Sequence, residues 1–283
     1  MIILKNEQLE VAIDPDRGMT VESFRFRNRE FLRWEAERKK AGLTYGIPFL
    51  FPTPSKVEDN TYQFRGRKLP AVMHGFLRNE SFRVSSQSPF QVTAVAAFDG
   101  SFPLFPYQAE LQVKLTVEKE CLSWDISLTN LDNEPLSYGL GLHPYFLKEP
   151  GMEVKTSFFA SMPSDEHLIP SGQINAVDGT PLDFRSFGSV DGLIIDMVFL
   201  SEGPFQSTLR YQDAELRLSA SNDFSHGIIY TDTEKEYLCV EPLTCSTDAH
   251  NLAEKGYQTV SGLIVLEAGE TRESWVRLSA RTT

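Results

Sequence analysis

The fold is decided by two adjoining stretches, Leu111-Gln-Val-Lys-Leu-Thr-Val117 and Leu122-Ser-Trp-Asp-Ile-Ser-Leu128. In both stretches every second residue is apolar, which is typical of a β-strand with one face buried and the other exposed. Only the short segment from Glu118 to Cys121 separates them. The pattern therefore predicts an antiparallel hairpin.

Similar short runs extend the pattern over the chain, at 81–84, 214–220, 262–266 and 274–278, with turn residues at 99–100, 130–133, 178–179 and 268–270. Helical periodicity is almost absent. The best helix candidate runs from Thr247 to Lys255, with Thr247 as N-cap and Gly256 as the stop. Many strands separated by turns predict an all-β sandwich or barrel. Because no linker or repeat divides the chain, we expect one large β domain over residues 1–283.

Composition limits the function. The formal net charge of −12 argues against nucleic acid or an anionic membrane surface as a partner. Three cysteines without regular spacing form neither a disulfide framework nor a C-x-x-C metal motif. We see no signal peptide, and the most apolar run, 192–200, is too short to span a bilayer. We therefore expect a cytoplasmic protein.

The segment Tyr138-Gly-Leu-Gly-Leu-His-Pro-Tyr-Phe146 draws attention to a histidine. If it is a strand, Gly139, Gly141 and His143 share one face, and glycine inside a strand marks the close approach of a ligand or of another backbone. His143 would then stand at a strand end over an open floor. The alternative is a core histidine beside a tight packing contact.

The segment Tyr237-Leu-Cys-Val-Glu-Pro-Leu-Thr244 has the same form. Leu238 and Val240 share one face, and Cys239 and Glu241 share the other. A carboxylate in apolar surroundings has a raised pKa unless it is hydrogen-bonded, and a partly desolvated Glu is a suitable general base. The alternative is a Glu at the sandwich rim, paired with a surface Lys or Arg.

Two further segments carry weaker signals. Asp196 lies within the apolar run 192–200, where it would bind either a ligand or nearby backbone amides. His74 is followed by Gly75 and, four residues on, by Arg78, which could place two polar groups at a loop or strand end. No two histidines have the spacing of a zinc site, so we predict no catalytic metal and no cofactor.

Together these segments resemble the aldose 1-epimerase (galactose mutarotase-like) family over nearly the whole chain. The resemblance rests on elements such as Leu50-Phe-Pro, His74-Gly-Phe, Gly141-Leu-His-Pro-Tyr-Phe146 and Val240-Glu-Pro-Leu-Thr244. It implies a large antiparallel β-supersandwich with few short helices. It also implies a mutarotase that acts on a small-molecule sugar, as a monomer or homodimer.

The resemblance also implies roles for residues. His143 matches the general acid that protonates the ring oxygen, and Glu241 matches the general base that takes the proton from the C1 hydroxyl. We expect these two to act from opposite sides of one sugar. His74 and Asp196 match residues that hydrogen-bond the sugar hydroxyls.

One position departs from the family pattern. Many members have Asn-Arg where this chain has Ser55-Lys56, and lysine lacks the planar fork of arginine. Either Lys56 has a changed task, or Arg78 replaces it, or the substrate differs. A hexose-6-phosphate mutarotase, with a cationic cluster drawn from Lys56, Arg65, Arg67, Lys68 and Arg78, is therefore an alternative. A non-catalytic carbohydrate-binding protein on the same fold is another.

Overall fold

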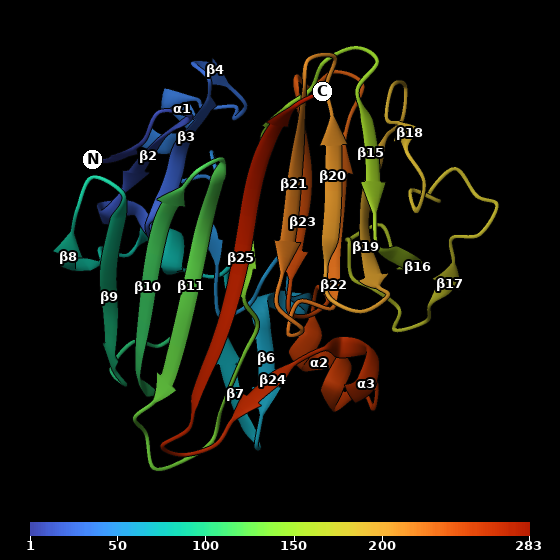
Figure 1. The fold of residues 1–283 in the computed structure, drawn as a ribbon. Coiled ribbons are helices and arrows are strands. Elements are labelled where there is room, and N and C mark those ends of the chain that lie inside the picture. Colours follow the sequence, from blue (N-terminus) through green and yellow to red (C-terminus); the bar gives the residue numbers. More distant parts are fainter.

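The computed structural model describes residues 1–283, and its largest element is a nine-stranded antiparallel sheet that fills the front of Figure 1. Its strands, in spatial order, are β18 (Gly188–Ser189), β15 (Glu153–Thr156), β20 (Gln206–Arg210), β21 (Ala214–Ala220), β25 (Thr271–Thr282), β11 (Cys121–Asn130), β10 (Gln108–Glu118), β9 (Gln91–Asp99) and β8 (Arg83–Gln87).

The predicted hairpin lies within this sheet. Strands β10 and β11 pair from Ala109–Asn130 to Glu118–Cys121, so the turn is where the sequence placed it. The alternation is also confirmed, because Leu115 and Trp124 are opposite each other and both are fully buried. Burial of each such side chain stabilises the fold by ~1.5–3 kcal/mol. The inward faces of these strands therefore supply much of the core.

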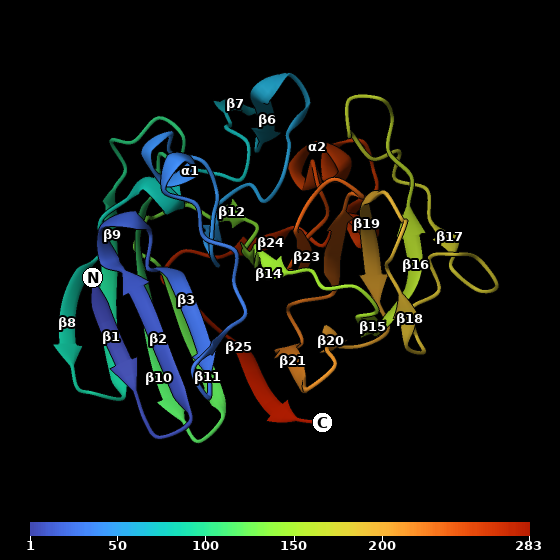
Figure 2. The same ribbon diagram turned by 90° about the horizontal axis from the view of Figure 1, so that it is seen from above.

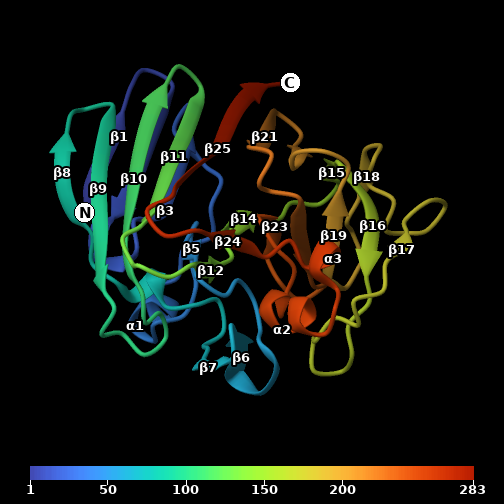
Figure 3. The ribbon, with the colours of Figure 1, turned by 90° about the horizontal axis from the view of Figure 1, so that it is seen from below.

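Two further sheets cover the large one. An eight-stranded sheet has the order β17 (Asn175–Ala176), β16 (Phe158–Met162), β19 (Ile195–Ser201), β22 (His226–Thr231), β23 (Tyr237–Leu243), β13 (Gly141–Leu142) and β5 (Phe49–Leu50), with β14 (Phe146–Leu147) also paired to β23. A four-stranded sheet has the order β1 (Ile2–Lys5), β2 (Leu9–Asp14), β3 (Thr20–Phe26) and β4 (Arg29–Glu30). The four-stranded sheet lies beside β10 and β11, and β16 and β19 lie near β15 at the other end (Figures 2 and 3). The predicted sandwich is thus confirmed, with antiparallel pairing throughout its sheets.

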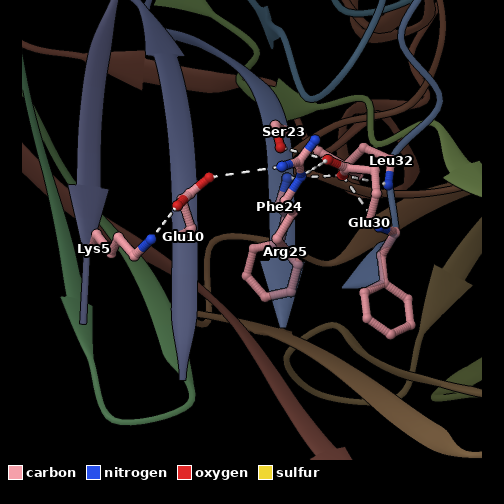
Figure 4. Close-up of polar contacts among 8 residues, drawn as sticks. Lys5, Glu10, Ser23, Phe24, Arg25, Glu30 and Leu32 are labelled. Carbon is pink, nitrogen blue, oxygen red and sulfur yellow. Dashed lines mark hydrogen bonds and ion pairs between the residues drawn. The ribbon is translucent and has the colours of Figure 1, made fainter. Parts of the chain in front are cut away.

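The four-stranded sheet is held at its edge by one carboxylate (Figure 4). Glu30 Oε1 accepts hydrogen bonds from the backbone amides of Phe24 at 3.0 Å and Leu32 at 3.0 Å, and Glu30 Oε2 accepts from Arg25 Nε at 3.3 Å. Because charged acceptors make the stronger hydrogen bonds, Glu30 fixes the point where the chain leaves β4. The chain then runs to the loop that carries α1 (Ala36–Lys40).

Helices are few and short, as expected. Besides α1 there are α2 (Ala249–Glu254), α3 (Gln258–Ser261) and the 3₁₀ turns η1 (Pro15–Arg17), η2 (Glu58–Asn60) and η3 (Leu77–Asn79). Two small ladders complete the fold, β6 (Thr61–Phe64) with β7 (Arg67–Pro70) and β12 (Leu136–Tyr138) with β24 (Ile264–Leu266). None of the helices has the length and apolar character that crossing a membrane requires.

The predicted helix at 247–255 exists as α2, but its predicted cap is wrong. The N-cap is Asp248, in the left-handed conformation at φ 55, and no side chain caps the helix. Asp248 Oδ1 instead accepts from the Glu58 amide at 3.0 Å and from Asn251 Nδ2 at 2.7 Å. A long-range contact to the η2 segment therefore occupies the side chain nearest the helix start.

Candidate active site

The site is built on a face of the eight-stranded sheet where residues of three strands line up in rungs. Asp196 on β19 is opposite Tyr230 on β22, which is opposite Cys239 on β23. One rung along, Ile228 on β22 is opposite Glu241 on β23. Because directly paired residues of an antiparallel sheet point to the same face, these side chains lie together.

The opposite face of β23 belongs to the core. Leu238 and Val240 are fully buried in the main apolar cluster, as the alternation predicted. Glu241 points the other way and is only 2% exposed. The strand therefore carries its carboxylate on the face away from the main core, within the wall of a pocket.

His143 meets Glu241 directly. Its backbone amide, just after β13, donates to the Pro48 carbonyl at 3.1 Å, which fixes its position beside β5. His143 Nε2 lies 3.2 Å from Glu241 Oε1. The ring stacks on Tyr145 with centroids 4.6 Å apart, and meets the edge of the His74 ring at 5.1 Å. Packing on two sides therefore holds His143 in place.

The two groups were expected on opposite sides of a sugar, and this is wrong, because they touch. Their proximity still suits ring opening, since the hydroxyl oxygen and the ring oxygen are both bonded to C1. His143 and Glu241, on one wall of the cavity, can therefore reach the ring oxygen and the C1 hydroxyl of the same sugar.

These side chains line a cavity of about 400 Å³. That volume is at the small end of the range of ~300–1,000 Å³ that is typical of ligand pockets. Larger hollows lie on the outer face of the nine-stranded sheet, but their charged groups, such as Arg210 and Glu215, are engaged in ion pairs. The cavity lining combines segments from across the chain: Arg38, Leu43, Thr44, Ser55, Met73, His74, Arg78, His143, Tyr145, Ser164, Leu168, Asp196, Met197, Val198, Ile228, Tyr230, Tyr237, Glu241 and Thr247.

Burial sets the protonation of the pair. Desolvation, and then the nearby His74, lower the pKa of His143 well below its usual range. Desolvation, and then the charge of Asp196, raise the pKa of Glu241 well above its usual range. These shifts favour the neutral imidazole and the protonated carboxyl. A neutral imidazole beside a protonated carboxyl holds the same number of protons as an imidazolium beside a carboxylate. Transfer of one proton from Glu241 Oε1 to His143 Nε2, over 3.2 Å, converts the first form into the second.

Four buried polar atoms of the pocket residues have no partner within the protein. They are His74 Nδ1, Arg78 Nε, His143 Nδ1 and Glu241 Oε2. Because buried polar atoms without partners are rare in folded proteins, each such atom calls for an explanation. Their concentration around one cavity indicates a site that binds a polar ligand.

The comparisons with known proteins agree with this geometry. Residues 1–279 match the family model described as Aldose 1-epimerase. This chain belongs to the aldose 1-epimerase family.

Its relatives are distant. Protein LacX (plasmid) of Lactococcus lactis is 25% identical over 280 residues, which cover 89% of this chain and 91% of that protein. The uncharacterized protein YihR of Escherichia coli K12 is 24% identical over 242 residues, covering 78% of this chain and 74% of that protein. A galactose mutarotase-like protein from Clostridium acetobutylicum superposes with a TM-score of 0.86 at 20% identity, over 99% of this chain and 95% of that one. The galactose mutarotase-like fold is thereby confirmed.

Within this aldose 1-epimerase family member, the pocket unites the four residues that the resemblance implied, His143, Glu241, His74 and Asp196. Arg78, which was offered as a replacement for Lys56, joins them. Burial, and then the charge of Arg78, lower the pKa of His74 to about 3, so His74 is neutral. Asp196, which lies within an apolar run of the sequence, is exposed and lines the cavity. Desolvation by the surrounding wall nevertheless raises its pKa.

Lys56 does not join them. Ser55 adopts a left-handed φ of 61 and lines the cavity, whereas Lys56 Nζ donates to the His167 carbonyl at 2.6 Å. The expected cationic cluster is also wrong in part, because Arg65, Arg67 and Lys68 belong to the β6–β7 hairpin and are not among the lining residues. Of the predicted cations, only Arg78 reaches the cavity.

Arg38 is a pocket residue that sequence reasoning missed. It lies on α1, a helix of five residues with no apolar face to mark it. Its Nε donates to the Thr44 carbonyl at 2.7 Å, and its Nη2 donates to Tyr145 Oη at 3.2 Å. Arg38 thus braces the tyrosine on which His143 stacks. The only available signal was Tyr145 itself, in the His-Pro-Tyr-Phe segment.

The two glycines before His143 have a packing role. A Cβ on Gly139 would lie 2.3 Å from Cys245 Sγ, and a Cβ on Gly141 would lie 2.3 Å from Leu243 Cδ2. Neighbouring side chains therefore occupy the space beside both glycines, where a ligand or another backbone was expected.

Proposed function

We propose that this protein is a mutarotase that interconverts the α and β anomers of an aldose by acid and base catalysis, without a cofactor. The observation that carries the proposal is the contact of 3.2 Å between His143 Nε2 and Glu241 Oε1 in the lining of the cavity. A pure binding protein has no need for a buried proton donor and acceptor in contact.

In the forward step, carboxylate Glu241 removes the proton from the C1 hydroxyl while imidazolium His143 gives a proton to the ring oxygen. The bond between C1 and the ring oxygen breaks, and C1 becomes an aldehyde carbon. Rotation about the bond between C1 and C2 presents the other carbonyl face. The reverse transfers then close the ring as the other anomer and restore both groups. Each positioned proton transfer contributes ~10²–10⁴-fold to the rate.

The remaining lining residues hold the sugar. Asp196, exposed to the cavity one rung from Glu241, is placed to accept from a hydroxyl group. His74 Nδ1 and Arg78 Nε are buried polar atoms without protein partners. Together they offer the mixture of acceptors and donors that a polyhydroxylated ligand needs.

The test is anomer exchange in freshly dissolved α-D-glucose and α-D-galactose, followed by NMR. We expect wild type to accelerate exchange, and His143→Ala and Glu241→Gln to lose ~10²-fold or more. Glu215→Gln is the matched control, since Glu215 is also a buried carboxylate (6% exposed) but pairs with Arg210 and Arg281 away from the cavity. A folded protein that binds a sugar without accelerating exchange would instead be a carbohydrate-binding protein.

A second candidate is a mutarotase of a phosphorylated hexose. The observation that favours it concerns Arg38 and Arg78, which both line the cavity. Their guanidinium groups donate hydrogen bonds to carbonyl and hydroxyl oxygens, and no carboxylate lies within ion-pair distance of either. Two guanidinium groups without a counter-ion favour an anionic substituent.

Glucose 6-phosphate in the same NMR assay separates the two candidates. If the phosphorylated sugar is preferred, Arg38→Gln raises its KM without raising that of glucose. Arg65→Gln, in the β6–β7 hairpin, is the control that leaves both values unchanged. Equal KM values for both sugars in wild type would refute this second candidate.

A further inference from the structure

Cys239 is a side chain of the site that the proposed reaction does not use. It lies on β23 two residues before Glu241 and on the same face, and it is fully buried. One ligand atom from each of His143, Cys239 and Glu241 lies within 4.8 Å of the other two. A thiol, an imidazole and a carboxyl thus converge on one point, with His143 and Glu241 lining the cavity and Cys239 fully buried beside them rather than in the lining.

We propose that these three residues form an inhibitory binding site for a thiophilic divalent cation of the zinc class. Three protein ligands with a fourth position open to water is the arrangement of Zn²⁺ sites that face a cavity. Sulfur and imidazole nitrogen favour Zn²⁺ over Mg²⁺ or Ca²⁺, which prefer oxygen ligands.

The geometry needs little adjustment. Zinc bonds of ~2.0–2.3 Å in a tetrahedron place the ligand atoms ~3.3–3.6 Å apart. His143 Nε2 and Glu241 Oε1 are already 3.2 Å apart, so mainly the Cys239 side chain has to move, by ~1 Å. The cation would enter from the cavity that His143 and Glu241 line, and the buried thiol would turn toward it.

A second observation supports a ligand at this point. Glu241 Oε2 and His143 Nδ1 are buried without partners in the protein. A cation bound by both oxygens of the Glu241 carboxylate would engage Oε2, the acceptor that the fold leaves free, together with Oε1. Asp196 lies on the same rung as Cys239, two strands away, and lines the same cavity as His143 and Glu241.

Binding of the cation would displace protons and inactivate the acid–base pair of His143 and Glu241. Two protons leave to solvent as the cation binds, one from the Cys239 thiol and one from the His143–Glu241 pair, because metal ligands bind deprotonated. His143 Nε2 and Glu241 Oε1 then hold the cation with the lone pairs that proton transfer requires. The inhibition rests on the proposed mutarotase function, whereas the binding does not.

Binding is tested with Co²⁺ as a spectroscopic substitute for Zn²⁺. We expect one equivalent per chain and a sulfur-to-cobalt charge-transfer band in wild type, reversed by excess Zn²⁺. The band should be lost in Cys239→Ser and Cys239→Ala, which are two independent small replacements in case one does not fold. Cys121→Ser is the matched control, because Cys121 lies on β11 of the other sheet and should leave the band unchanged. No band in wild type, or a band lost only in Cys121→Ser, would overturn the proposal.

Inhibition is tested by anomer exchange with and without Zn²⁺ and a chelator. We expect Zn²⁺ to lower the wild-type rate ~10²-fold, the contribution of a positioned proton transfer, and the Cys239 variants to keep their metal-free rate. Exchange that Zn²⁺ slows equally in wild type and the Cys239 variants would contradict the site. If the cobalt band forms but no sugar exchanges faster, the metal site stands and the mutarotase function fails.

Discussion

His226 makes the stability of this protein depend on pH in a way that can be calculated. The side chain is 3% exposed at the start of β22. Its Nε2 lies 2.9 Å from the Val260 carbonyl and must carry the proton to donate to it, and its Nδ1 accepts from Ser225 Oγ at 2.9 Å. This arrangement fits the neutral ring. Burial lowers the pKa of His226 to about 4.

The sign follows from proton binding. In the unfolded chain His226 has a pKa of about 6.5, so below that pH the unfolded state binds more protons than the folded state and stability falls as the pH drops. With a folded pKa of about 4, the loss between about pH 7 and about pH 4.5 is ~2.4 kcal/mol for this one residue. That is a large part of a typical folding free energy of ~5–15 kcal/mol.

Urea unfolding of wild type and His226→Gln at both pH values measures this contribution. Glutamine keeps a donor for Val260 but does not titrate in this range, so the variant should lose ~2.4 kcal/mol less than wild type on acidification, whatever its stability at neutral pH. His167→Gln is the control, since that side chain is 71% exposed. A His226→Gln protein with the full wild-type dependence on pH would refute the reasoning.

Two further predictions concern the site and its support. Burial, and then the charge of Asp196, raise the pKa of Glu241, and the alkaline limb of the pH–rate profile reports the loss of the proton that Glu241 shares with His143. Asp196→Asn should therefore move the alkaline limb to lower pH. An unmoved limb in a variant with an altered KM would show that Asp196 only binds the substrate. Gly139→Ala should lower the free energy of unfolding in urea by ~1–3 kcal/mol, because the new Cβ would lie 2.3 Å from Cys245 Sγ and 2.7 Å from Pro54 Cδ. An unchanged midpoint of the urea transition would contradict this packing role.

The sequence predicted strands well where each strand has one buried and one exposed face. The run at 214–220 coincides with β21, and the run at 274–278 lies inside β25. The N-terminal sheet was not predicted. Its closing contact, the bonds from Glu30 to backbone amides of β3 and the following loop, depends on chain geometry rather than on a residue pattern. The single domain, the cytoplasmic location and the oligomeric state stay predictions.

The site could be predicted only as separate pieces. Alternation placed Glu241 on the face opposite Leu238 and Val240, and this is confirmed. Its contact with His143 could not be inferred from spacing, because 98 positions of chain separate the two and β13 and β23 meet at a single registered pair, Gly141 with Leu243. Arg38 could not be identified for the same reason.

The distribution of charge in the cavity determines how an anionic substrate would be oriented. His143 and Glu241 compensate each other within 3.2 Å, so the acid–base pair adds little net charge. Arg38 and Arg78 have no carboxylate partner, although the protein as a whole carries −12. Since partly desolvated charges are weakly screened, these guanidinium groups, together with the Asp196 carboxylate of the same cavity, set the local field. An anionic substituent drawn to them would leave C1 for the pair, and a neutral aldose would lack that means of orientation. The ratio of KM values for the two sugars therefore measures how much of the binding comes from charge.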